Sequence, residues 1–100
     1  MSSDDIEIDR LIHEPARLKI MAQLFVVEEA DFIFLMRQTG LTWGNLSSHM
    51  SKLETADYVE VRKEFLDKKP HTILKLTAKG RDAFEEYRRA MDQVLKDLPD

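Results

Sequence analysis

The stretch that decides the fold runs from Ser47 to Val59 and reads Ser-Ser-His-Met-Ser-Lys-Leu-Glu-Thr-Ala-Asp-Tyr-Val. It predicts most of a helix that begins after Thr42, since threonine is a good N-cap residue. The helix should end near Ala56, because Asp57 tolerates the left-handed backbone that often follows a helix. Three apolar side chains recur at helical spacing and should face inward: Leu46, Met50 and Leu53.

The segment before this helix predicts further helices. A weakly helical pattern covers residues 4–13, and Pro15 suits the first turn of a new helix that should run to about Val27. Residues 28–31 are expected to form a connection, and a short helix should follow over residues 33–38.

The segment after it predicts two strands, over residues 58–65 and 71–76, with a polar loop over residues 66–70. Thr77 should then cap a long final helix that ends near Lys96. The fold class is therefore mainly α with a small β-hairpin (α+β) in a single domain, in the order of a winged helix-turn-helix.

Two motifs resemble one family of regulators. The stretch from Ser47 to Val59 resembles the recognition-helix signature of MarR/ArsR-like winged helix-turn-helix transcriptional regulators. Leu76-Thr77-Ala78-Lys79-Gly80 resembles the junction between wing and last helix in that family. Met50 and Asp57 depart mildly from the family pattern, and the wing lacks the glycines often seen at its tip.

The resemblance implies a protein that binds double-stranded DNA in a sequence-specific manner and regulates transcription as a homodimer, with repression the commoner outcome. Residues 15–77 would form the DNA-binding body. Residues 4–13 and 78–98 would form dimerisation helices. A small-molecule effector is a further partner found in many MarR-like relatives, but nothing in this sequence identifies one.

The face of the central helix opposite its apolar stripe contains no acidic residue. Short side chains allow close approach to a major groove, and hydroxyl, amide and ammonium groups can donate to bases and phosphates. His49 lies on the flank, where packing is a better explanation than DNA contact. The predicted DNA-binding residues of this helix are Gly44, Asn45, Ser47, Ser48, Ser51 and Lys52.

The hairpin contributes basic side chains beside this helix. We expect them to contact phosphates, although a charged hairpin that only aids solubility is the alternative reading. Trp43, at the start of the helix, is expected to anchor it against the core. The predicted DNA-binding residues of the wing are Arg62, Lys63, Lys68 and Lys69.

The long final helix is apolar along one side, and a domain this small would leave part of that side uncovered. We expect it to pair across a two-fold axis, unless it packs back on its own domain. The predicted dimer-interface residues are Leu11, Phe84, Tyr87, Met91, Val94, Leu95 and Leu98.

Charge and composition narrow the classes of function that remain open. The net charge is −4, which favours a protein–protein contact module as the alternative function, but residues 37–75 alone have a net charge of +2. The absence of cysteine excludes thiolate metal sites, and the three histidines are widely spaced. We find no motif of an enzyme, metal or cofactor site, and no apolar run of membrane-spanning length. The expected location is the cytoplasm.

Overall fold

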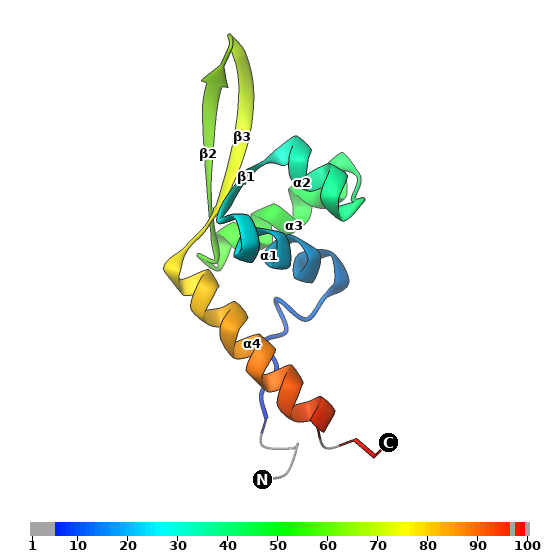
Figure 1. Ribbon diagram of the computed structural model, residues 1–100. Coiled ribbons are helices and arrows are strands. Elements are labelled where there is room, and N and C mark those ends of the chain that lie inside the picture. The colour runs from blue at the N-terminus through cyan, green and yellow to red at the C-terminus, as the bar shows by residue number, and fades with distance from the viewer. Residues whose placement is uncertain (1–5, 97, 100) are drawn as a thin grey trace.

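The computed structural model describes residues 6–96, 98 and 99. The described residues form four helices and three strands, in an elongated molecule with extents of 55 × 25 × 20 Å. The elements are α1 (Pro15–Val27), β1 (Glu29–Asp31), α2 (Phe32–Thr39), α3 (Trp43–Thr55), β2 (Val59–Leu66), β3 (Lys69–Leu76) and α4 (Ala78–Lys96). Figure 1 shows the β2–β3 hairpin projecting from one end of a body of three helices, while α4 runs away in the other direction.

Local sequence signals set the ends of α2 and α3. Gly40 ends α2 with a φ of 73°, in the left-handed region that glycine adopts without strain. The Thr42 side chain caps α3 by accepting a hydrogen bond of 3.2 Å from the backbone N–H of Asn45. Asp57 follows α3 with a φ of 62°. These boundaries confirm the helix predicted between Thr42 and Ala56.

The structure contains a third strand that the sequence pattern did not predict. The prediction placed a connection over residues 28–31, but Glu29–Asp31 forms β1, which pairs antiparallel with β3. The sheet order is β1-β3-β2, with Ala30 opposite Leu74. Three residues are too few to show the two-residue alternation of a strand, so the pairing with β3 creates this element.

The predicted helix over residues 4–13 is wrong for its described part. Residues 6–9 have no regular structure and residues 10–12 form a turn, while residues 4 and 5 lie outside the described residues. The Asp9 carboxylate accepts hydrogen bonds from the backbone N–H groups of Leu11 (2.8 Å) and Ile12 (3.2 Å). It also accepts one from the Tyr58 hydroxyl. Such side-chain bonds satisfy backbone donors locally and compete with helix formation.

The core lies between the helices and the inner face of the sheet. Leu46 and Leu53 are fully buried and Met50 packs against them, which confirms the inward face predicted for α3. Complete burial of one such side chain stabilises the fold by about 1.5–3 kcal/mol. The fully buried side chains are Ile12, Ile20, Met21, Leu24, Leu35, Leu46, Leu53, Val59 and Leu74.

Gly80 explains the junction motif between wing and final helix. The Thr77 hydroxyl caps α4 by accepting a 2.9 Å hydrogen bond from the Gly80 N–H, as predicted. A Cβ on Gly80 would lie 2.1 Å from the carbonyl oxygen of Tyr58. The motif therefore needs glycine because α4 crosses the start of the hairpin in direct contact with its backbone.

Among the helices of the described residues, none combines the length and apolar character that crossing a bilayer requires.

Candidate nucleic-acid interface

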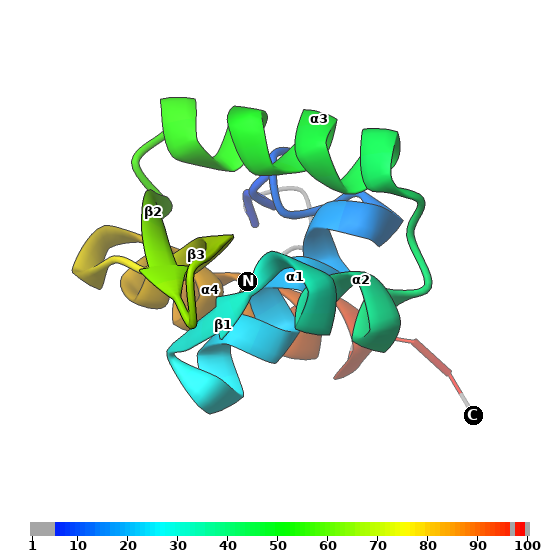
Figure 2. The same ribbon diagram turned by 90° about the horizontal axis from the view of Figure 1, so that it is seen from above.

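The outer side of α3 is a continuous exposed polar surface. Figure 2 shows α3 along one edge of the body, with its long side turned away from the other elements. The structure brings all the predicted residues of this helix together on that side or its flank. Ser47 is half-buried, and the exposed members are Gly44, Asn45, Ser48, Ser51 and Lys52.

The first turn of α3 has open space at one position, Gly44. A Cβ on Gly44 would meet no atom within 4 Å, so only backbone is presented at this point. The N-terminus of a helix carries a partial positive charge, which favours phosphate groups nearby. A DNA backbone could therefore approach this turn closely.

The flank of α3 is held by residues at the start of α1. The Arg17 guanidinium donates a hydrogen bond of 3.1 Å to His49 Nδ1, and Glu14 Oε2 lies 3.6 Å from the same nitrogen. Burial raises the pKa of the Glu14 carboxylate. Hydrogen bonds from the backbone N–H groups of Arg17 and Ala16 lower it by more, so the pKa falls overall. His49 is thus half-buried and held by contacts with the protein, and its lack of DNA contact stays a prediction.

Trp43 packs the start of α3 against a core residue, as expected. Its ring lies 4.6 Å from the Phe32 ring, centre to centre, which joins the start of α3 to α2. The side chain nevertheless keeps 61% of its surface exposed, because it stands at the edge of the core.

The tip of the hairpin is a tight two-residue turn. Asp67 and Lys68 both have positive φ, 53° and 65°, and Leu66 pairs directly with Lys69. Two successive positive φ values are the mark of a type I′ hairpin turn, which asparagine and glycine usually occupy. The predicted loop over residues 66–70 is therefore too long, because the strands extend into it.

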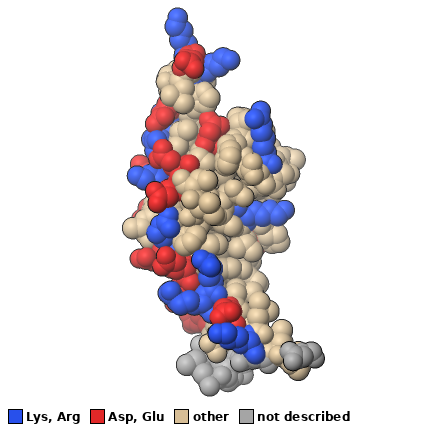
Figure 3. Space-filling model, in the orientation of Figure 1, with Lys and Arg blue, Asp and Glu red and all other residues tan. Residues whose placement is uncertain are grey.

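Three of the four predicted wing cations are free of ion pairs with the described residues. All three side chains are exposed, and Figure 3 shows basic groups at the far end of the wing with acidic atoms beside them. Down the side of the hairpin acidic and basic groups also alternate. The free cations are Lys63, Lys68 and Lys69.

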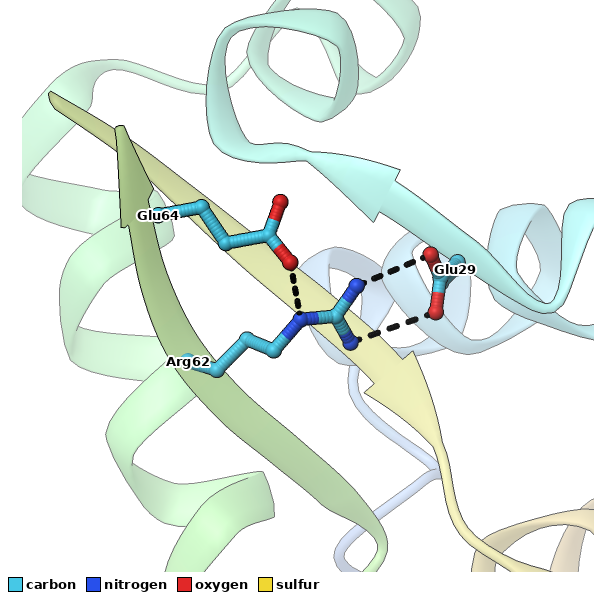
Figure 4. Close-up of polar contacts among 3 residues, drawn as sticks. All are labelled: Glu29, Arg62 and Glu64. Atoms are coloured by element: carbon cyan, nitrogen blue, oxygen red, sulfur yellow. Dashed lines mark hydrogen bonds and ion pairs between the residues drawn. The ribbon is translucent and has the colours of Figure 1, made fainter. Parts of the chain in front are cut away.

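Arg62 is bound to two carboxylates, as Figure 4 shows. Its Nη atoms donate to Glu29 at 3.0 and 3.2 Å, and its Nε donates to Glu64 at 2.6 Å. The hydrogen bonds with Arg62 lower the pKa of Glu29, and the two carboxylates raise the pKa of Arg62. The charge of Arg62 is thus balanced, and the contact ties β2 to β1 across β3.

His71 and Asp31 form a second link between the wing and the body. Their side chains meet at 2.6 Å, and Asp31 also caps α2 by accepting a 2.7 Å hydrogen bond from the Ile33 N–H. Burial raises the pKa of Asp31, but the hydrogen bonds with His71 and the backbone lower it overall. Sequence reasoning missed both links, because their acidic partners belong to the unpredicted strand β1.

The histidines lie in separate places. His13 Nδ1 contacts the Tyr87 hydroxyl at 2.9 Å, while His49 and His71 have the partners given above. Within the described part of the chain, no three side chains of histidine or carboxylate type come together as a metal site would require.

The apolar side of α4 divides into two parts. Phe84 and Tyr87 are buried in the chain itself, with the Phe84 ring 5.1 Å from that of Phe25, and Leu11 also packs against the core. Leu95 and Leu98, near the other end, keep 57% and 62% of their surface exposed. A groove of about 670 Å³ separates α1 from this second part, and its lining includes Leu18, Phe25, Arg88, Met91 and Leu95.

Comparison with known proteins agrees with this geometry. A family model described as a winged helix DNA-binding domain matches residues 16–95. An uncharacterized protein of Methanocaldococcus jannaschii is 36% identical over 89 residues, which cover 89% of this chain and 97% of the relative.

Solved structures show the same fold. The structure of a transcriptional regulator homologue from Pyrococcus horikoshii OT3 has a TM-score of 0.84 and 29% identity, covering 90% of this chain and 91% of that one. A MarR-family transcriptional regulator from Silicibacter pomeroyi has a TM-score of 0.61 and 19% identity, covering 90% of this chain and 62% of that one. These matches confirm the resemblance read from the two sequence motifs.

Proposed function

This chain belongs to the family of winged helix DNA-binding domains and has the fold of MarR-like transcriptional regulators, and we propose that it is a homodimeric, sequence-specific repressor. The observation that carries the proposal is the exposed polar side of α3, together with a projecting wing whose three exposed lysines form no ion pair with the described residues. A DNA-binding role would place the protein with the chromosome, which lies in the cytoplasm of cells without a nucleus.

In this proposal α3 enters the major groove. Asn45, Ser48 and Lys52 are exposed on the outer side, where their amide, hydroxyl and ammonium groups would hydrogen-bond to base edges. Gly44, in the first turn, would offer its backbone N–H to a phosphate, and Ser47, on the flank, would offer its hydroxyl. Ser51 lies on the same side of the helix, one turn after Ser48.

The wing would contact the flanking backbone through Lys63, Lys68 and Lys69. Arg62 has a different role from the phosphate contact that was predicted from the sequence. Since Glu29 and Glu64 already bind its guanidinium, we assign it to holding the wing at a fixed angle to the body.

A second copy of the chain would cover the end of α4. Met91 and Val94 are half-buried and Leu95 and Leu98 are exposed, so an apolar surface remains available after the protomer has folded. Pairing of two α4 helices about a two-fold axis would place two recognition helices about 34 Å apart, one turn of DNA. Repression would then follow from steric exclusion of the transcription machinery at a roughly palindromic site. We assign any small-molecule effector to the groove between α1 and α4, beside this surface.

The alternative is a winged helix that binds proteins and no DNA. Exposed apolar side chains on the helical body favour it, with Val26 at 79% and Phe34 at 38% of their surface exposed. The overall net charge of −4 also favours this alternative, because DNA is itself negatively charged.

Fluorescence anisotropy of a labelled pool of random DNA duplexes, titrated at several salt concentrations, separates the two. Each phosphate contact contributes about 0.9 to the slope of log affinity against log salt, so Lys68→Gln/Lys69→Gln should lower the slope by up to about 1.8. Lys19→Gln, which changes an exposed lysine on α1, is the matched control and should leave the slope unchanged. A folded protein that binds no duplex at about 50 mM salt would support the alternative.

A further inference from the structure

Phe65 is an aromatic side chain without a packing partner in the core. It keeps 77% of its surface exposed at the end of β2, and its neighbour Leu66 keeps 47% exposed. In the strand register Phe65 lies opposite Pro70, so two apolar residues face each other just below the turn. The fold therefore gains little from Phe65, and exposed apolar surface of this kind often marks a contact site.

The surroundings of Phe65 select the type of partner. Lys63 shares its face of the strand, two residues away. Lys68 lies in the turn beside the exposed Asp67, and Lys69 lies opposite Leu66 on the other face of the hairpin. None of these lysines is ion-paired with another described residue, while the nearby Glu64 is bound by Arg62. An exposed apolar ring with an unpaired lysine on its own face, and two more unpaired lysines at the end of the hairpin, suits a polyanion with an apolar interior, which is the character of a DNA groove.

The position of the wing indicates which groove of the DNA it would meet. Residues 56–58 alone connect α3 to β2, so a wing that meets DNA bound by α3 must do so beside the major groove. The adjacent groove is the minor groove, about 6 Å wide. A two-residue turn is the narrowest way to join two paired strands. The tip is therefore the slimmest part of this hairpin, and a side chain at the tip can enter a groove that the whole ribbon does not fit.

We propose that Phe65 inserts into the minor groove that flanks the α3 contact and lies against its sugar walls and base edges. Lys63, Lys68 and Lys69 bind the phosphates on either side. Apolar side chains are used in this way by many minor-groove proteins, where they widen or kink the duplex. The inference rests on the DNA binding proposed above and adds to it a contact that is not electrostatic.

The test compares Phe65→Ala with Val26→Ala, a truncation of another highly exposed apolar side chain, distant from the wing on α1. Both variants are tested on one duplex. It is chosen from the random pool as the member that binds the wild type most tightly among those with A·T-rich flanks. Phe65→Ala should bind it about tenfold more weakly, equivalent to about 1.4 kcal/mol, with an unchanged salt slope because no phosphate contact is lost. Val26→Ala should bind like the wild type.

Competition with netropsin, which occupies A·T minor grooves, tests the location. It should weaken binding of the wild type and of Val26→Ala by a similar factor, and that of Phe65→Ala much less. Unchanged affinity of Phe65→Ala, or insensitivity of the wild type to netropsin, would overturn the inference while leaving DNA binding itself intact. A change in the oligomeric state of Phe65→Ala without DNA would overturn it too, by showing that the tip contacts protein. Failure of the wild type to bind any duplex would instead refute the proposed function.

Discussion

Replacement of Gly80 by alanine should destabilise the protein although alanine is the better helix former. The added Cβ would lie 2.1 Å from the Tyr58 carbonyl oxygen, whereas a carbon and a carbonyl oxygen in close contact are about 3.3 Å apart. The start of α4 must therefore move by about 1 Å. The obstacle is backbone, so no side-chain rotation can relieve it.

The magnitude follows from the contacts that this movement disturbs. Overpacking of a tight site costs about 1–3 kcal/mol. Loss of the 3.1 Å hydrogen bond from the Thr77 N–H to the Tyr58 carbonyl oxygen costs about 1 kcal/mol more. The higher helix propensity of alanine offsets about 1 kcal/mol. The net loss in the free energy of unfolding is about 2 kcal/mol, which corresponds to a fall in Tm of about 8–16 °C for a chain of this size.

Gly44→Ala provides the matched control, because Gly44 also lies in the first turn of a helix but has open space around it. It should raise Tm by about 2–8 °C, from a propensity gain of about 0.5–1 kcal/mol. Both variants and the wild type are compared by circular dichroism during heating, at one protein concentration so that association contributes equally. If Gly80→Ala melted at or above the wild-type temperature, the close contact between α4 and the hairpin would be refuted.

Three further predictions concern the wing, the dimer and acid stability. Arg62→Gln should speed hydrogen exchange at the β1 amides without changing the salt slope of DNA binding; a fall of about 0.9 in that slope would place Arg62 on a phosphate instead. Leu95→Glu should sediment as a folded monomer, because it places a charge on the exposed apolar end of α4, and an unchanged dimer would exclude this surface. The lowered pKa of Asp31 means that its ionised form stabilises the folded state, so the free energy of unfolding should fall as the pH drops below the ordinary aspartate value of 3.8. Asp31→Asn should weaken that pH dependence, whereas a stronger dependence would contradict the assignment.

Local signals in the sequence were enough to predict most of the helical body. The spacing of Leu46, Met50 and Leu53 gave the inward face of α3, and with it the exposed side proposed for DNA contact. Thr42 and Thr77 marked the starts of α3 and α4 because a capping hydroxyl acts within one helical turn. These features depend on residues three or four apart, which a single sequence displays directly.

Features that join distant segments were decided by the tertiary structure. Strand β1 forms only because β3 pairs with it, and Glu29 then reaches Arg62 across the sheet. Asp9 turns the N-terminal segment away from the helical course that its apolar pattern predicted. At the wing tip the sequence offered no glycine, yet strand pairing forces positive φ at Asp67 and Lys68.

The site shows the same division. The sequence determined which residues of α3 and the wing are polar or basic, since composition and period are local properties. It could not determine which cations are free, because the sequence shows that Arg62 and the three lysines are basic but not that the fold brings Glu29 to the Arg62 guanidinium. Likewise Phe84 and Leu95 belong to one apolar stripe, and only the packing of α1 against the first part of α4 leaves Leu95 exposed. Charge pairing and burial are sums over contacts between distant parts of the chain, so the folded structure alone decides them.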